Sequence, residues 1–278
     1  MASSTAWPLR RVTYATRASR AVLGQPYEGI ERTLERLAGW RDSRRDGWPY
    51  ATTDALERRV HELIGAPWPC QHDGFEDVWG AAIQELRAQG MQIGRGTFGG
   101  WDDADIRLGR VAWCLARQLR PERVVETGVA RGLVTHILLA ALARNGTGHL
   151  WSIDLPPLIE ASLAEETAAA VPETLRDRWT LIRGSSRRRL PALIAALGDI
   201  DLFVHDSMHT TRNLSFELAH AWPALTSIGA ALIDDVEKNA ATRTFLQARP
   251  DTPAVISPSG DGTALIGVLT KQTGGARH

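Results

Sequence analysis

A cofactor-binding turn is indicated by the segment at 126–132, which reads ETGVARG. It follows the strand-like pair Val124-Val125 and leads into the apolar segment at 133–143. The first glycine allows the backbone to turn sharply, and the second allows a ligand to approach the chain closely. The dinucleotide fingerprint G-x-G-x-x-G does not fit, because its second and third glycine positions would be Ala130 and Leu133.

Acidic and small polar residues recur where strands are expected to end. These residues are Glu126, Asp154, Ser185, Asp206, Asp234 and Asp235. Ligands of open α/β sheets bind beyond the carboxyl ends of the strands, and aspartate is a poor strand former. Each carboxylate alone is equally compatible with a helix cap, but together they indicate a ligand-binding edge. Asp154 is placed to accept hydrogen bonds from a ribose diol.

The carboxylates of Asp206, Asp234 and Asp235 form a second group with His209. Three carboxylates that converge from neighbouring strands repel one another unless a cation joins them, and hard oxygen ligands favour Mg²⁺. A bound metal would lower the pKa of a substrate hydroxyl, and a neutral imidazole could then accept the proton. The alternative for His209 is a helix-entry residue that bonds to local backbone.

From residue 102 the pattern alternates between strands and helices, which predicts a parallel sheet covered on both faces. Strands are expected at 123–126, 149–154, 179–183, 201–206 and 230–235. Helices are expected at 103–119, 131–144, 158–170, 191–197, 210–222 and 237–248. The segments 254–257 and 264–269 flank a turn and predict an antiparallel hairpin. The fold class is therefore α/β, with a Rossmann-like sheet of five parallel strands plus a C-terminal hairpin.

Residues 1–101 are expected to form a helical cap or lid region, separate from a cofactor-binding domain at 102–278. Helices are predicted at 28–39, 53–64 and 75–89 by apolar residues at helical spacing. Six of the ten tryptophans lie in this region. The glycine-rich break at 94–100 could be a mobile lid or a simple hinge.

Composition limits the classes of partner. The chain has 278 residues, equal numbers of basic and acidic residues, and no apolar run of membrane-spanning length, so we expect neither nucleic acid nor a membrane as partner. The first 27 residues are rich in arginine and contain no acid, which fits either an organelle transit peptide or an arm; we favour the arm and a cytoplasmic location. The two cysteines, Cys70 and Cys114, do not indicate a disulfide framework, and Cys114 is interpreted as a buried core thiol.

The segments at 124–128, 152–154, 201–209 and 232–236 resemble the class I S-adenosylmethionine (SAM) methyltransferases. Within that class they resemble the metal-dependent small-molecule O-methyltransferases, both the catechol type and the macrocin/novobiocin sugar type. The resemblance covers roughly residues 103–270. One departure is Ala130, which replaces the middle glycine of the E/D-x-G-x-G-x-G motif.

The resemblance implies a role for each candidate residue. The expected SAM site comprises Glu126, Gly128, Gly132, Asp154, Ser185 and Asp206, and the expected Mg²⁺ ligands are Asp206, Asp234 and Asp235. His209 occupies the position of the lysine base of the catechol enzymes and is the expected general base. The implied reaction is methyl transfer to a hydroxyl of a small molecule, a sugar or an aromatic or diol compound of natural product biosynthesis.

Other functions remain open at this point. One is a metal-independent class I enzyme that methylates nitrogen or carbon. Another is a non-catalytic binding subunit that uses the tryptophan-rich N-terminal region as its interaction surface. A homo-oligomer formed through the N-terminal region is also an expectation. A nicotinamide-dependent redox enzyme is disfavoured by the glycine spacing.

Overall fold

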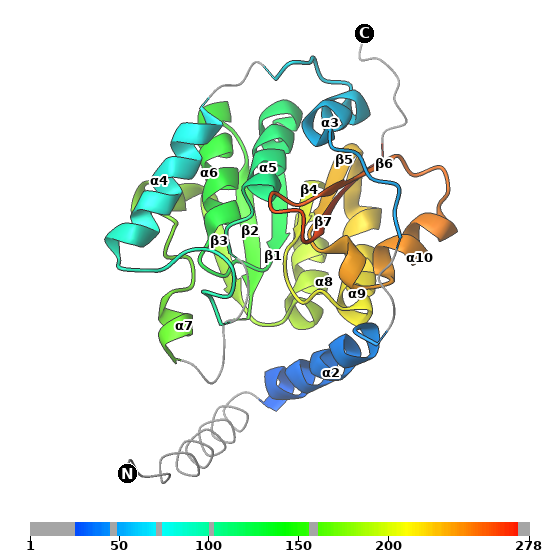
Figure 1. Cartoon of the computed structure of the whole chain (residues 1–278), viewed down its shortest axis with the longest axis horizontal. Helices are drawn as coiled ribbons and strands as arrows, with labels where there is room; N and C mark the ends of the chain where they lie inside the picture. The colour runs from blue at the N-terminus through cyan, green and yellow to red at the C-terminus, as the bar shows by residue number, and fades with distance from the viewer. Residues whose placement is uncertain (1–25, 45–48, 71–73, 100–102, 156–160, 272–278) are drawn as a thin grey trace.

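A mostly parallel sheet of seven strands organises the computed structural model, which describes residues 26–44, 49–70, 74–99, 103–155 and 161–271 (Figure 1). The strands are β1 (Arg123–Thr127), β2 (His149–Asp154), β3 (Trp179–Arg183), β4 (Ile200–His205), β5 (Leu225–Ile233), β6 (Ala254–Pro258) and β7 (Leu265–Thr270). Their order is β3-β2-β1-β4-β5-β7-β6, and β7 runs in the direction opposite to the other six strands. The predicted α/β class, with a parallel sheet and a C-terminal hairpin, is confirmed.

The helices pack on both faces of this sheet. They are α2 (Pro26–Asp42), α3 (Leu56–Ile64), α4 (Phe75–Ala88), α5 (Ile106–Leu119), α6 (Leu133–Asn145), α7 (Ala161–Glu165), α8 (Ser186–Leu197), α9 (Thr211–Ala224) and α10 (Ala241–Ala248). Short 3₁₀ turns, η1 (Glu173–Arg178) and η2 (Val236–Lys238), precede β3 and α10. Val124 packs into the core shared with α5 and α6, whereas Val125 packs into the core shared with α8 and α9. The side chains of successive strand residues therefore pack on opposite faces of the sheet, and both faces are buried.

The helices predicted at 158–170 and 191–197 differ most from the observed ones. The helix expected at 158–170 is the short α7, followed by turns, and residues 156–160 lie outside the described part of the chain. Helix α8 begins at Ser186, five residues before Pro191, so this proline lies within the helix and not at its first position. Proline lacks an N–H and cannot donate to the carbonyl one turn earlier, which made it a plausible start signal in the sequence.

The predicted N-terminal cap has two structural parts. Helices α3 and α4 place Leu56, Val60 and Phe75 in the same apolar core as α5 and α6. Helix α2 lies at the opposite end of the molecule from α3 (Figure 1). The first 25 residues, with the predicted arm or transit peptide, lie outside the described residues.

Helix α2 is polar on its inner side and apolar on its outer side. Glu28, Glu31 and Glu35 are buried, and Asp42 contacts the start of α9. In contrast, the large apolar side chains of α2 are exposed, by 39% to 58%: Tyr27, Ile30, Leu34, Leu37 and Trp40. The helix is therefore held to the domain by polar contacts. The oligomer contact predicted in the N-terminal region is compatible with this outer face.

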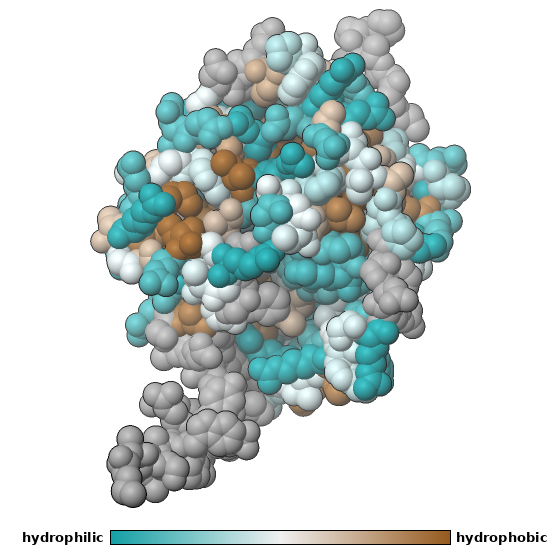
Figure 2. All heavy atoms as spheres, in the orientation of Figure 1, coloured by the Kyte–Doolittle hydropathy of each residue, from teal (hydrophilic) through white to brown (hydrophobic). Residues whose placement is uncertain are grey.

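The surface shows no membrane-spanning element among the described residues: none of their helices is both long and apolar enough to cross a bilayer. On the face drawn in Figure 2, hydrophobic residues form small groups among hydrophilic ones.

The turn after β1 passes very close to the end of β4. The N–H of Asp206 donates to the carbonyl of Thr127 at 2.8 Å. Gly128 has φ of +88°, and a Cβ atom at this position would lie 1.9 Å from the carbonyl oxygen of Asp206. Such a separation is impossible without moving the backbone, so the juxtaposition of the two strand ends requires glycine at 128.

We predict that Gly128→Ala destabilises the protein far more than Gly146→Ala. Gly146, which caps α6, also has a positive φ of +74°, but a Cβ there would meet nothing within 4 Å. The control substitution introduces only backbone strain of about 1 kcal/mol. The steric overlap at 128 adds about 1–3 kcal/mol. Urea unfolding of both variants measures the difference; equal losses would contradict the stated role of Gly128.

Candidate active site

The glycine-rich turn after β1 packs against the protein's own segment at 168–171. Ala130 and Gly132 have φ of +48° and +84°. The N–H groups of Ala168 and Ala170 donate to the carbonyls of Ala130 and Arg131, each at 2.8 Å. A Cβ at Gly132 would lie 2.9 Å from Val171 Cγ2. Gly132 therefore allows close approach of this segment, and the left-handed conformation of Ala130 explains why glycine is the usual residue there.

Asp154 at the end of β2 holds the turn in place. Its Oδ1 accepts a hydrogen bond from the N–H of Val129 at 3.1 Å. Burial raises the pKa of Asp154, and the N–H groups of Val129 and Ala130 oppose this shift. The guanidinium of Arg32, from α2, donates to the next carbonyl, that of Leu155, at 2.6 Å. Asp154, the residue expected to bind a ribose, thus lies where the turn, β2 and α2 meet.

Glu126 at the end of β1 is completely buried. Its Oε2 accepts hydrogen bonds from Ser152 Oγ at 2.6 Å and Thr135 Oγ1 at 2.8 Å, whereas its Oε1 has no partner among the described residues. Burial raises the pKa of Glu126 to about 7; the two hydroxyls oppose the shift, and the charge of Asp154 adds to it. A buried carboxylate oxygen without a donor is costly, so this atom is suited to a ligand.

Asp206 and Asp234 converge with His209 beyond β4 and β5. One potential ligand atom from each of the three side chains lies within 4.8 Å of the others. Burial raises the pKa of both carboxyl groups well above the usual value, and so do the neighbouring negative charges: Asp235 and Glu126 for Asp206, Asp206 and Asp235 for Asp234. A divalent cation would remove this repulsion and hold both groups ionised.

Asp235 lies beside this cluster and already pairs with the positively charged side chain of a lysine. Its Oδ2 forms an ion pair with Lys238 Nζ and lies 3.4 Å from His209 Nε2. Burial lowers the pKa of His209 to about 4; Asp235 opposes the shift, whereas His205 and Lys238 add to it. The imidazole is therefore neutral at pH 7 and can accept a proton.

A buried glutamate on α9 forms hydrogen bonds that fix the loop carrying the cluster. Glu217 accepts hydrogen bonds from Thr127 Oγ1 and His205 Nδ1, both at 2.7 Å, and from Ser207 Oγ and Asn213 Nδ2, both at 2.9 Å. Burial acts to raise the pKa of Glu217, but the charge and hydrogen bond of His205, with the hydroxyl donors, lower it to about 2. One carboxylate thus connects the ends of β1 and β4 to the loop that carries the candidate metal ligands.

Helix α2 covers the carboxyl end of β3 as well. Glu28 Oε2 accepts a hydrogen bond from the N–H of Ser185 at 3.1 Å. The hydroxyl of Ser185 is buried and has no partner among the described residues. Nearby, Glu31 pairs with Arg212 at 2.8 Å and Glu35 bonds to Thr210. Of the expected cofactor residues, Ser185 is the one that α2 encloses most directly.

Arg131, in the glycine turn after β1, contacts the glycine-rich segment that follows α4. Its buried guanidinium pairs with Asp103 at 2.9 Å and Glu166 at 2.7 Å, and it donates to the carbonyls of Gln92 and Thr97 at 2.5 and 3.0 Å. Thr97, within the predicted lid or hinge, is therefore attached to the turn, while Gly100 lies outside the described residues.

The residues that the sequence reading missed are Glu217, Arg131 and Lys238. Lys238 had a usable signal: it is one of two lysines among 32 basic residues, and it follows Asp235 by three positions. Glu217 and Arg131 had none, because a charged residue on a helix or in a turn is usually solvated.

The comparisons with known proteins agree with this fold. Residues 125–236 match the profile of a family described as a methyltransferase domain. No curated protein sequence matches the chain significantly. A solved structure of a putative O-methyltransferase from Klebsiella pneumoniae is 16% identical, with a TM-score of 0.52 over 79% of this chain and 97% of that one.

Two further solved structures have the same fold. The O-methyltransferase TomG from Streptomyces achromogenes, involved in tomaymycin synthesis and solved with SAM, is 16% identical over 78% of this chain and 99% of that one, with a TM-score of 0.52. An O-methyltransferase from Bacillus cereus, solved with S-adenosylhomocysteine (SAH), is 14% identical over 78% and 97% of the chains, with a TM-score of 0.51.

The strand order and the solved structures show that this protein has the class I methyltransferase fold, and the segment at 125–236 is the part that matches a methyltransferase domain.

We predict that Glu126→Gln and Glu217→Gln have opposite effects on stability. Because the pKa of Glu126 is raised to about 7, its protonated form stabilises the wild type fully below pH 4, and this contribution is lost as pH rises through 7. Glu126→Gln is always neutral, so at pH 8 its free energy of unfolding is expected to exceed that of the wild type by about 3 kcal/mol. A pKa lowered to about 2 gives a contribution that is present above pH 4.5 and lost as pH falls toward 2, so Glu217→Gln loses about 3 kcal/mol at neutral pH.

Urea unfolding in chelator at several pH values between 4 and 8 measures both effects. Because the two substitutions remove the same charge from equally buried sites, each variant is the control for the other. Stability differences of the same sign would show that burial alone, without the partners described above, governs these glutamates.

Proposed function

We propose that this protein is a metal-dependent O-methyltransferase that transfers the methyl group of SAM to a hydroxyl of a small molecule. One observation carries the proposal: the cluster of Asp206, His209 and Asp234 begins at the residue whose backbone touches Gly128. A cofactor turn and a candidate metal site are thus adjacent. The names of the three similar structures, all O-methyltransferases or putative ones, support hydroxyl acceptors.

The residues at the sheet edge fit SAM. Glu126 Oε1 and Ser185 Oγ are buried acceptors without partners among the described residues, and both lie at carboxyl ends of strands. SAM, when bound, supplies a methyl group on a sulfonium that is a good leaving group. The proposed cofactor residues are those of the sequence prediction: Glu126, Gly128, Gly132, Asp154, Ser185 and Asp206.

The donor set fits a hard divalent cation such as Mg²⁺. Asp206 and Asp234 provide oxygen ligands, and Asp235 completes the acidic group once Lys238 releases it. The cation, when bound, would lower the pKa of a coordinated hydroxyl. His209, whose lowered pKa of about 4 leaves the imidazole neutral at pH 7, is the proposed acceptor of the hydroxyl proton. The remainder of the catalysis is positioning of the hydroxyl.

The acceptor is proposed to be a sugar or an aromatic or diol natural product with vicinal hydroxyls. Two oxygens on neighbouring carbons can occupy adjacent positions on one cation, which orients the hydroxyl to be methylated. A metal-independent enzyme remains the second candidate, because Lys238 already neutralises Asp235 in the structure.

We predict that Asp234→Asn, or excess EDTA, lowers methyl transfer at least about 100-fold, because the acidified hydroxyl is lost. Binding of SAH, measured by calorimetry, is expected to persist, since Asp234 is not among the proposed cofactor residues. The matched control is Asp251→Asn, an exposed aspartate in the turn before β6. The assay uses labelled SAM with a catechol and with a diol sugar as acceptors.

Undiminished activity in EDTA would replace the metal-dependent mechanism with the metal-independent one. Absence of SAH binding to the wild-type chain would instead favour a non-catalytic subunit.

We predict that His209→Gln lowers kcat about 100-fold or more while the Mg²⁺ concentration for half-maximal activity changes little, because a base acts after the metal has bound. The cluster geometry also permits His209 to be a metal ligand. In that case the same variant would need much more Mg²⁺ and would recover activity when it is supplied.

A further inference from the structure

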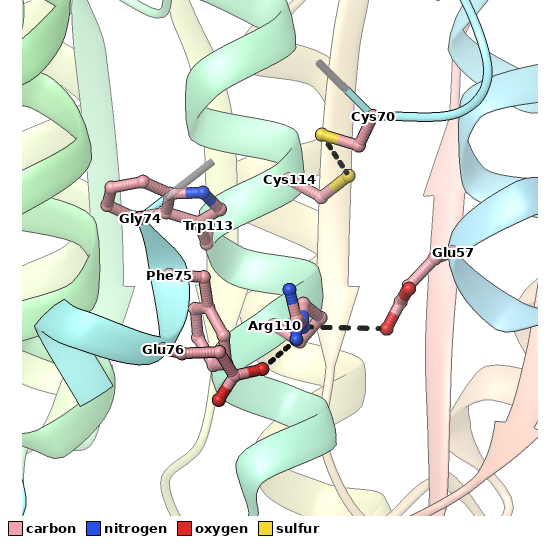
Figure 3. Close-up of a pocket in the computed structure, with 8 residues that line it drawn as sticks. All are labelled: Glu57, Cys70, Gly74, Phe75, Glu76, Arg110, Trp113 and Cys114. Carbon is pink, nitrogen blue, oxygen red and sulfur yellow. Dashed lines mark hydrogen bonds and ion pairs between the residues drawn. The ribbon is translucent and has the colours of Figure 1, made fainter. Parts of the chain in front are cut away.

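A second group of potential ligands lies between the N-terminal helices and α5, apart from the sheet edge. His61 is on α3, Cys70 lies in the loop that follows, and Cys114 is on α5. Their Nε2 and Sγ atoms all lie within 4.8 Å of one another. Figure 3 shows the two sulfur atoms pointing toward each other, 4.0 Å apart. None of these residues takes part in the proposed methyl transfer.

The tautomer of His61 follows from its neighbours. Its Nδ1 lies 2.6 Å from the carbonyl oxygen of Pro67, which can only accept, so Nδ1 carries the proton and donates it. The lone pair on Nε2 therefore faces Cys114 Sγ, 2.8 Å away. A histidine oriented by a backbone carbonyl through one nitrogen, with the other directed at the ligand position, is the usual arrangement of metal-binding histidines.

The spacing fits a tetrahedral soft metal ion. Zinc–sulfur bonds of about 2.3 Å place two thiolates about 3.8 Å apart, close to the 4.0 Å between Cys70 and Cys114. If an ion replaces the proton between them, Cys114 Sγ and His61 Nε2 must move apart by less than about 1 Å. The ligand atoms are therefore already near their coordination positions.

The charge balance also fits a divalent ion. Two thiolates, a neutral imidazole and M²⁺ have zero net charge, which suits a site where His61 and Cys114 are buried. The hydrogen bond with Cys70, together with burial, raises the pKa of Cys114 in the absence of an ion. Gln118 donates an N–H to Cys70 Sγ at 3.5 Å, a contact that would stabilise a thiolate.

A cavity beside the sulfurs leaves room for a fourth ligand. It has a volume of about 130 Å³ and is lined by both cysteines together with the apolar rings of Phe75 and Trp113 (Figure 3). A water molecule occupies far less than this volume. Across the cavity, Arg110 pairs with Glu57 at 3.7 Å and also with Glu76, so the charged groups that line the cavity leave one net negative charge, which favours a cation.

We propose that His61, Cys70 and Cys114 bind a thiophilic divalent metal ion, Zn²⁺, with water as the fourth ligand. The ion is structural: it joins α3 and the loop after it to α5, and so attaches part of the N-terminal region to the methyltransferase domain. Three protein ligands with one solvent position also leave the ion exchangeable through the cavity.

The experiment loads the reduced full-length chain with Co²⁺ as a spectroscopic substitute for Zn²⁺. We expect one equivalent to produce the sulfur-to-cobalt charge-transfer absorption that only thiolate ligands give, and Zn²⁺ to displace it. Zn²⁺ in 100-fold excess over its Kd is expected to raise Tm by about 5 °C. Cys70→Ala is the main variant, because Cys70 is only half-buried and its removal leaves the core packing intact.

Asp234→Asn is the matched control, since it removes a ligand of the other candidate site and is expected to retain the charge-transfer absorption. Cys70→Ala and His61→Gln are expected to lose both the absorption and the Tm shift. Absence of this absorption in the wild type overturns the proposal, as does its persistence in Cys70→Ala. A Cys70–Cys114 disulfide that forms on mild oxidation in protein that takes up no Co²⁺ would also overturn it and identify a redox pair.

Discussion

The contact between the backbone at Gly128 and the backbone at Asp206 constrains everything around it. It brings the glycine turn of β1 against the end of β4, so that whatever binds in the turn lies next to the side chain of Asp206. Parallel strands make this possible, because their carboxyl ends meet at one edge of the sheet. The transfer chemistry proposed here needs a donor and an activated hydroxyl side by side, and this backbone contact provides that proximity.

Buried charge is the second organising feature. Glu217 is satisfied by four donors and remains ionised, whereas Glu126 has one unpaired oxygen and is easily protonated. The first carboxylate holds the strand ends together; the second has spare hydrogen-bonding capacity at the end of β1. Two residues of the same type, buried to the same extent, therefore differ because of their partners.

The fold and the edge residues were predictable because their signals are local or follow from topology. Short apolar strands alternate with helices, and Asp206 and Asp234 end neighbouring strands, so their convergence follows from the sheet. The inward orientation of Glu217 depends on which side of α9 faces β4, and the four contacts of Arg131 come from distant segments; neither is visible in residue order. The early start of α8 was missed because Pro191 is tolerated inside the helix.

Helix α2 has the reverse of the usual amphipathic orientation. Its acidic residues face Arg212, Thr211 and the N–H of Ser185, while its apolar residues face outward. Ionic attachment weakens as salt is added, whereas apolar attachment does not. Because the glutamates of α2 are buried, salt screens their pairs less than it screens surface pairs, so the enclosure of the β3 edge loosens only in part as ionic strength rises.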